Sequence, residues 1–248
     1  MILGSLSNLS LHRLNNCVQF ARGLVSQCCL LCHAQSGRRI LCKTCDYKLP
    51  RLAGPICRQC ATPLPAGQRC GACFASPPRF DHVVAPFAYV LPIDALIQAL
   101  KYGGRLLVSR PLADALASTI DERVDLLIPM PLSEARLRER GFNQAHEIAR
   151  LVSRATETDL ALNVCRRVRH NPPQAMLPWK QRAGSVRGAF VCDADLHGMR
   201  VAVVDDVVTT GATLNEIARV LKRAGASHVS GWSAARVLRH AVTPGPAN

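Results

Sequence analysis

Residues 201–213, VAVVDDVVTTGAT, place two carboxylates directly after four apolar residues and then a glycine among three threonines. The apolar run is short and β-branched, which is typical of a strand covered on both faces. Thr213 and Glu216 have the spacing of a capping box, so we predict a helix over residues 214–224. Residues 209–213 would then form a loop over a helix N-terminus, where backbone N–H groups and hydroxyls bind a phosphate monoester.

The two acids need a different partner, because carboxylates repel a phosphate. Asp205 and Asp206 can accept hydrogen bonds from hydroxyl groups or bind a divalent cation. Gly211 permits a close approach of the ligand to the backbone. A ligand with a phosphate at one end and a diol at the other fits both halves of the motif, which predicts a site for a ribose 5-phosphate.

Eight of the 12 cysteines form a repeat in the N-terminal third of the chain. Each C-x2-C pair supplies two thiolates from one tight turn, and a tetrahedral Zn²⁺ needs four. We therefore predict two structural zinc sites, closed to catalysis, in preference to disulfides. The two units read C-x2-C-x9-C-x2-C and comprise Cys29, Cys32, Cys42 and Cys45, then Cys57, Cys60, Cys70 and Cys73.

The pairing of the cysteines has alternatives. Cys28 can replace Cys29 as a ligand, and a cross-braced site can combine the first C-x2-C pair of each unit. Sequential pairing is favoured because each unit then closes a short loop at low entropic cost. The three isolated cysteines are interpreted as apolar packing residues: Cys17, Cys165 and Cys192.

Apolar strands alternate with amphipathic helices after residue 78, which predicts an α/β fold with a mostly parallel sheet and ligands at the C-terminal ends of its strands. We expect strands at 83–90, 125–132, 201–204 and 228–235, and helices at 92–105, 110–120, 134–155 and 214–224. The predicted organisation is an N-terminal amphipathic helix over 1–27, a double zinc ribbon over 28–78, the sheet domain over 79–240 and a flexible tail over 241–248.

The formal net charge is +14, and residues 1–78 carry nine basic side chains against one acid. Such a surface attracts a polyanion such as nucleic acid through its phosphates. The helix expected over 1–27 would dock on the body of the protein or, alternatively, bind a partner or a membrane surface. We find neither a signal peptide nor an apolar run approaching the roughly 18 residues of a membrane span, and so expect a soluble, cytoplasmic protein.

The segment VAVVDDVVTTGAT resembles the phosphoribosyl pyrophosphate (PRPP) signature of type I phosphoribosyltransferases. The resemblance implies that Asp205 and Asp206 are the catalytic acids and hold the ribose 2- and 3-hydroxyls. It also implies that Mg²⁺ binds together with PRPP. The 5-phosphate would lie on the loop formed by Thr209, Thr210, Gly211, Ala212 and Thr213.

Together with the cysteine repeat, the segments FDHVVAPFAYVLPIDALIQALKYGGR and IPMPLSEARLRERGFNQAHEIA resemble the ComF family, which includes competence proteins needed for DNA uptake and GntX-like proteins. This implies a type I phosphoribosyltransferase-like fold for residues 79–240. Four basic residues are candidate contacts for the PRPP phosphates: Lys101, Arg136, Arg140 and Arg182. Arg136 and Arg140 can alternatively be solvated charges on a helix face.

Two classes of function fit these features. The first is an enzyme of pentosyl transfer that moves phosphoribosyl to an unknown acceptor. The second is a non-catalytic, PRPP- or nucleotide-responsive protein that binds single-stranded DNA and works with DNA-uptake or recombination proteins. No residue stands out as a general base, so PRPP binding is better supported than transfer. With 4% aromatic residues, DNA binding would depend mainly on phosphate contacts and fall steeply with salt.

Overall fold

The structure is a computed structural model that describes residues 27–168 and 186–238. Contacts divide the chain into two compact units, Met1–Leu49 and Pro50–Asn248. The predicted N-terminal helix, the predicted tail and Arg182 lie outside the described residues. The division falls inside the region 28–78 that the cysteine repeat occupies, so the first cysteine group lies in the smaller unit and the second in the larger one.

The smaller unit is a hairpin followed by a short helix. Strands β1 (Gln27–Cys28) and β2 (Gln35–Gly37) pair antiparallel, and α2 (Lys43–Tyr47) follows. Its described residues contain three buried apolar side chains: Cys29, Leu41 and Leu49. So few buried apolar side chains cannot offset the entropy of ordering residues 27–49, and a bound metal would supply most of the folding free energy of this segment.

The larger unit is built on a six-stranded sheet in the order β3-β10-β9-β5-β6, with β4 also paired to β10. Every pairing in this sheet is parallel, which confirms the predicted fold class. The two longest strands, β9 and β10, lie at its centre. The strands are β3 (His82–Val84), β4 (Phe87–Ala88), β5 (Leu126–Pro129), β6 (Asp159–Leu160), β9 (Arg200–Val208) and β10 (His228–Arg236).

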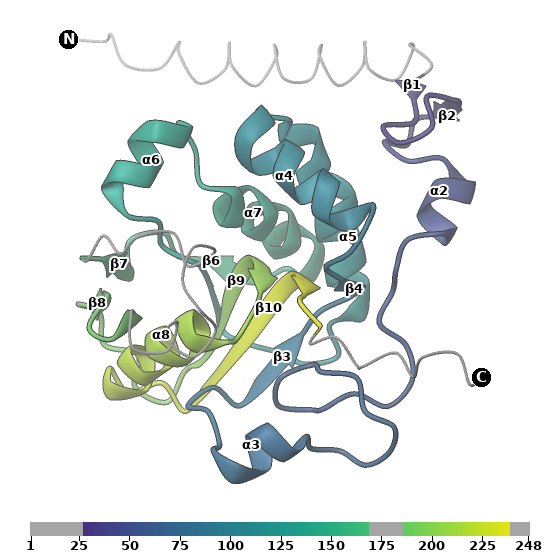
Figure 1. Cartoon of the computed structure of the whole chain (residues 1–248). Coiled ribbons are helices and arrows are strands. Elements are labelled where there is room, and N and C mark those ends of the chain that lie inside the picture. Colours follow the sequence, from purple (N-terminus) through teal and green to yellow (C-terminus); the bar gives the residue numbers. More distant parts are fainter. Residues whose placement is uncertain (1–26, 169–185, 239–248) are drawn as a thin grey trace, which may run out of the picture. The chain divides into compact units, whose positions relative to one another are not determined.

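Helices cover both faces of the sheet (Figure 1). The connections from β3 to β5 and from β5 to β6 move along the sheet in one direction, and the connection from β9 to β10 moves in the other. Because such crossovers are right-handed, α8 lies on the face of the sheet opposite α4, α5 and α7. The helices of this unit are α3 (Gly71–Ala75), α4 (Ile93–Gly103), η1 (Leu106–Val108), α5 (Ser109–Thr119), α6 (Glu134–Arg140), α7 (Gln144–Thr156) and α8 (Ala212–Arg223). A separate antiparallel pair is formed by β7 (Cys165–Arg167) and β8 (Phe190–Cys192).

Two predicted elements are each divided in the structure. The strand expected over 83–90 is split into β3 and β4 around Pro86, which has no N–H to donate to a ladder and whose carbonyl accepts from the Leu52 N–H at 2.8 Å. The helix expected over 134–155 is split into α6 and α7 by Gly141, whose φ is 78°.

The predicted capping box is wrong. Helix α8 begins at Ala212 behind Gly211, so Thr213 lies inside the first turn. Glu216 instead accepts the Gly188 N–H at 2.7 Å and a hydrogen bond from Arg219 at 2.6 Å. Strand β9 also continues beyond the expected residue 204 to Val208, so the two acids belong to the strand itself.

Candidate functional site

A cavity of about 650 Å³ opens at the C-terminal end of β9. Strand β5 stops pairing at Pro129, opposite Val204, whereas β9 remains paired with β10 up to Val208. The edge of β9 that faces β5 therefore has no strand partner at the positions of the two acids. Eight of the predicted site residues line the cavity: Lys101, Arg136, Arg140, Asp205, Asp206, Thr209, Gly211 and Thr213. Thr210 and Ala212 belong to the same loop but are not among the lining residues.

Asp206 is 3% exposed and held by two neighbours. The Lys101 ammonium contacts Oδ2, and the Gln144 side-chain amide donates to Oδ1 at 3.1 Å. Burial raises the pKa of Asp206, but Lys101 and Gln144 outweigh burial and lower it overall. Lys101, predicted to contact a phosphate, is thus paired with one of the two acids.

Asp205 lies on the opposite side of β9, because successive strand residues point to opposite faces. Its Oδ1 accepts the Asp206 N–H at 2.8 Å. Burial and then the neighbouring Asp206 raise the pKa of Asp205 well above its ordinary value. A hydroxyl donor or a cation placed beside Asp205 would stabilise its charged form.

Three arginines line the same cavity as the acids. Arg140 lies with its guanidinium carbon 5.3 Å from the centre of the Tyr102 ring and donates to Gln144. Arg167 comes from β7, and burial and then Arg136 lower its pKa. Two guanidinium groups close enough to repel one another create a favourable position for an anion. No motif in the sequence indicated Arg167.

Gln144 was also missed, although it lies in the segment IPMPLSEARLRERGFNQAHEIA, which resembles the ComF family. Asn143 caps α7 by accepting the Ala145 N–H at 2.9 Å, and its amide donates to the Met130 carbonyl at 3.0 Å, just past the end of β5. These bonds place Gln144, the first residue of α7, beside Asp206. The sequence did contain a signal for this position, because Asn143 precedes a helix with periodic apolar residues and Asn is a preferred N-cap residue.

The loop after β9 is shaped by Gly211, whose φ of 80° disfavours any side chain. Its carbonyl accepts the Asn215 N–H at 2.8 Å, and the Thr210 hydroxyl oxygen accepts the Ala212 N–H at 3.1 Å. The loop therefore wraps the N-terminus of α8, where backbone N–H groups and the helix dipole favour an anion.

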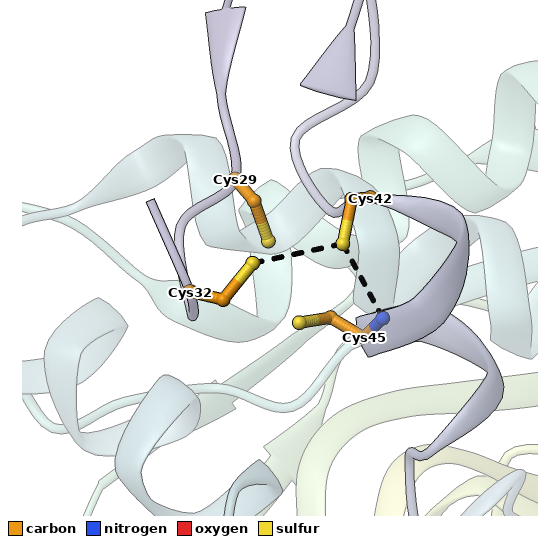
Figure 2. Close-up of side chains that lie close together, drawn as sticks. All are labelled: Cys29, Cys32, Cys42 and Cys45. Atoms are coloured by element: carbon orange, nitrogen blue, oxygen red, sulfur yellow. Dashed lines mark hydrogen bonds between the residues drawn. The ribbon is translucent and has the colours of Figure 1, made fainter. Parts of the chain in front are cut away.

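The eight predicted zinc ligands form two groups of four, in the sequential pairing, with sulfur atoms within 4.8 Å of one another. Figure 2 shows the four sulfur atoms of the first group converging on one point. The Sγ–Sγ distances from Cys32 to Cys42 and from Cys60 to Cys70 are both 3.7 Å. A tetrahedral zinc with Zn–S bonds of about 2.3 Å requires about 3.8 Å. Both groups therefore fit structural Zn²⁺ in the sequential pairing, and neither group includes Cys28.

Hydrogen bonds and charge inside the two groups also favour a metal. The Cys45 N–H donates to Sγ of Cys42 at 3.4 Å, and the Cys73 N–H to Sγ of Cys70 at 3.5 Å. Burial raises the pKa of Cys60, but hydrogen bonds from Thr62 outweigh it and lower that pKa to about 7. Burial, and then the hydrogen bond and the charge of Cys60, raise the pKa of Cys73. Neighbouring thiolates repel one another, so a bound cation is what allows all four to be charged.

Among the described residues, none of the helices has the length and apolar character needed to cross a membrane.

Comparisons with known proteins agree with this architecture. Residues 21–74 match the Double zinc ribbon domain family and residues 109–233 match the Phosphoribosyl transferase domain family. The chain is 32% identical over 208 residues to Competence protein F of Haemophilus influenzae, which covers 79% of this chain and 90% of that protein. It is 30% identical over 207 residues to the DNA utilization protein YhgH of Escherichia coli K12, which covers 80% of this chain and 91% of the relative.

A solved glutamine PRPP amidotransferase from B. subtilis aligns with 51% of this chain and 26% of its own, at a TM-score of 0.37 and 22% identity. The two domain matches and the relatives at 30% identity or more span most of the sequence. The chain therefore belongs to the ComF family of competence proteins, with an N-terminal double zinc ribbon joined to a phosphoribosyl transferase domain.

Proposed function

We propose that the cavity at the end of β9 binds PRPP and that the chain uses this ligand in DNA uptake or utilisation. One observation carries the proposal: a single strand end brings two carboxylates and a loop at a helix N-terminus to the same cavity, which three arginines also line. PRPP has a matching arrangement of groups, with a 5-phosphate at one end, a ribose diol in the middle and a pyrophosphate at the other end.

The ribose 5-phosphate half would be bound by β9 and its loop. Backbone N–H groups at the start of α8, with the hydroxyls of Thr209 and Thr213, would donate to the 5-phosphate. Asp205 would accept hydrogen bonds from the ribose hydroxyls. Asp206 contributes the second carboxylate, which Lys101 and Gln144 already orient, so Lys101 acts on the ligand through Asp206.

The pyrophosphate half would be bound by guanidinium groups. Arg136 makes no hydrogen bond or ion pair with another described residue. Burial lowers the pKa of Arg167, and the charge of the nearby Arg136 lowers it further. An anionic ligand between them would relieve this repulsion. Arg140 is held by Tyr102 and Gln144 and completes the basic side of the cavity.

Mg²⁺ fits the same site, because carboxylate and phosphate oxygens are its preferred ligands and Asp205 and Asp206 both line the cavity. When bound, it would neutralise charge on the pyrophosphate leaving group. The protein's own contribution is to position the ribose and to stabilise the developing charge with its arginines.

Binding can be tested by calorimetry with PRPP and Mg²⁺. The double variant Asp205→Ala/Asp206→Ala should lose measurable binding, and Asp114→Ala, an exposed acid on α5, should bind like the wild type. Unchanged affinity in the double variant would remove the basis of the site assignment.

The loop can be tested with a matched pair of glycines that both have positive φ. A Cβ at Gly211 would lie 3.4 Å from Phe80 Cζ, whereas one at Gly198 has no neighbour within 4 Å. Gly211→Ala should weaken binding of ribose 5-phosphate about tenfold or more, because backbone strain distorts the phosphate-binding N–H groups. Gly198→Ala should leave the affinity unchanged, and equal losses in both variants would contradict a role for the loop.

The second proposed ligand is single-stranded DNA, which the names of the relatives and the charge of the ribbon support. In the smaller unit Arg38, Arg39, Lys43 and Lys48 are exposed, and Tyr47 beside them is 88% exposed. Phosphate contacts to the basic side chains and stacking on the ring suit a single strand. Tyr47→Ala should weaken binding of an oligonucleotide, measured by fluorescence anisotropy, and Phe74→Ala, which removes a ring that is 77% exposed in the larger unit, serves as the comparison.

Transfer is distinguished from binding alone by pyrophosphate release. A panel of nucleobases, assayed with and without single-stranded DNA, should identify the acceptor if the chain is a phosphoribosyltransferase. Absence of release with every acceptor, in protein that binds PRPP, would favour the non-catalytic alternative.

A further inference from the structure

Arg236, the last residue of β10, joins the second cysteine group to the loop of the proposed PRPP site. Its side chain is buried, with 7% of the residue exposed. Nε donates to the Cys60 carbonyl at 2.8 Å. One terminal nitrogen donates to the Val208 carbonyl at 3.1 Å and to the Thr209 carbonyl, and the other donates to the Thr62 hydroxyl at 3.3 Å.

The same cysteine group also reaches the loop along a second path. The buried Gln59 side chain donates to the Phe80 carbonyl at 3.4 Å. The Phe80 ring packs against Gly211, where a Cβ would lie 3.4 Å from Cζ and 3.5 Å from Cε1. The adjacent Arg79 N–H donates to Oδ1 of Asn215, in the first turn of α8, at 2.6 Å.

The Thr62 hydroxyl connects Arg236 to the metal ligands themselves. It lies 3.1 Å from Sγ of Cys60 while it accepts from Arg236. Partners of this kind orient the ligands of a metal site. The guanidinium is therefore hydrogen-bonded to Cys60 of the second cysteine group, to the neighbouring Thr62, and to Val208 and Thr209, where the loop after β9 begins.

These contacts make the two sites interdependent. A bound zinc would fix the backbone of the C-x2-C turn, or knuckle, at residues 57–60 and with it the Cys60 carbonyl. If the knuckle loosened, a buried guanidinium would lose an acceptor, which is costly, and Arg236 would shift. The Val208 and Thr209 carbonyls share that guanidinium, so their positions would change as well. Any such coupling acts equally in both directions.

We propose that the second cysteine group, with zinc bound, holds the loop at residues 209–211 in its ligand-binding conformation through Arg236 and Phe80. Arg236 is a positioning residue, and zinc in this group is a requirement for ligand binding at a cavity it does not line. The identity of the ligand rests on the proposed function, whereas the coupling between the cysteine group and the loop does not.

The test uses the full-length, zinc-loaded chain and the variant Arg236→Lys, which keeps the charge but cannot reach all of the acceptors. Native mass spectrometry should count two zinc ions in the variant. Calorimetry should show an affinity for ribose 5-phosphate about tenfold weaker or more, and amide exchange over residues 209–213 should be faster. Arg200→Lys, at the opposite end of β9, should change neither property.

A second set of variants removes zinc ligands and complements the arginine variant. Cys70→Ser/Cys73→Ser should lose one zinc and accelerate exchange at residues 209–213. The matched change Cys42→Ser/Cys45→Ser should also lose one zinc but leave the loop unchanged. Equal acceleration in both pairs, or in neither, would overturn the coupling.

Phe80→Leu tests the second path if Arg236→Lys does not fold, because it removes the ring but keeps an apolar side chain. Faster exchange at residues 209–213 with both zinc ions retained supports the proposal. Wild-type exchange and affinity in every folded variant of Arg236 or Phe80 would refute it. If the wild type binds neither ribose 5-phosphate nor PRPP, the proposed function fails, and the exchange rates still decide whether the cysteine group controls the loop.

Discussion

The two cysteine groups have identical spacing but different surroundings. In the first, Cys32 is exposed and Cys42 and Cys45 are half-buried, and residues 27–49 of its unit contain three buried apolar residues. In the second, three of the four cysteines are buried, and they pack in one apolar cluster with residues of the sheet domain: Cys57, Cys60 and Cys73, with Phe80, Val208 and Leu214.

The difference shows that one ligand motif can serve two structural roles. The first group organises a segment that has almost no other core. The second group forms part of the core of the phosphoribosyl transferase unit and lies next to its ligand loop.

The largest effect is expected when each group is disabled in turn. Cys57→Ser/Cys60→Ser should lower the melting temperature of the main transition by about 10 °C or more, because it removes both a metal and two buried core side chains. Cys29→Ser/Cys32→Ser should leave that transition nearly unchanged. The measurement is thermal unfolding by circular dichroism, and equal losses would contradict the comparison.

An intermediate effect is expected in the rate of zinc release. A chromophoric chelator should remove one zinc ion quickly from the more exposed first group and the other slowly, because the more buried second group must first open. The fast phase should be absent from Cys42→Ser/Cys45→Ser. A single rate for both ions in the wild type would show that burial does not distinguish the groups.

The smallest effect is expected at the opposite end of the sheet, where Glu122 accepts from Trp232 Nε1 at 2.8 Å and lies 3.1 Å from His228 Nε2. Burial raises the pKa of Glu122, but hydrogen bonds, from His82 above all, outweigh burial and lower it from 4.5 to about 2. A depressed carboxyl pKa stabilises the fold above the ordinary pKa, and this stabilisation is lost as the pH falls from 4.5 toward 2.

Glu122→Gln should therefore lower the melting temperature by a few degrees at pH 7, about 4 °C at most. The gap between wild type and variant should shrink as the pH is lowered through this range. Affinity for ribose 5-phosphate at pH 7 should not change, since Glu122 does not line the cavity. A large loss of affinity would mean that general destabilisation, rather than the second cysteine group, controls the loop.

Much of the site was predictable because its parts are adjacent in the chain. Asp205, Asp206 and the Thr-Gly loop occupy consecutive positions, so a strand followed by a helix is enough to bring them together. The sequence missed the length of β9 and the start of α8. Strand pairing with β10 extends the strand to Val208, and Glu216 finds partners at Gly188 and Arg219 in place of a cap.

By itself the sequence determined the ligand types, favoured the sequential pairing of the cysteines and predicted a loop over a helix N-terminus, because each depends on residues close together in the chain. Only the tertiary structure decided that Lys101 pairs with Asp206, that Arg167 enters the cavity and that Arg236 bonds to Cys60. These partners are separated by long stretches of chain. Their meeting depends on strand order and helix packing, which no local pattern specifies.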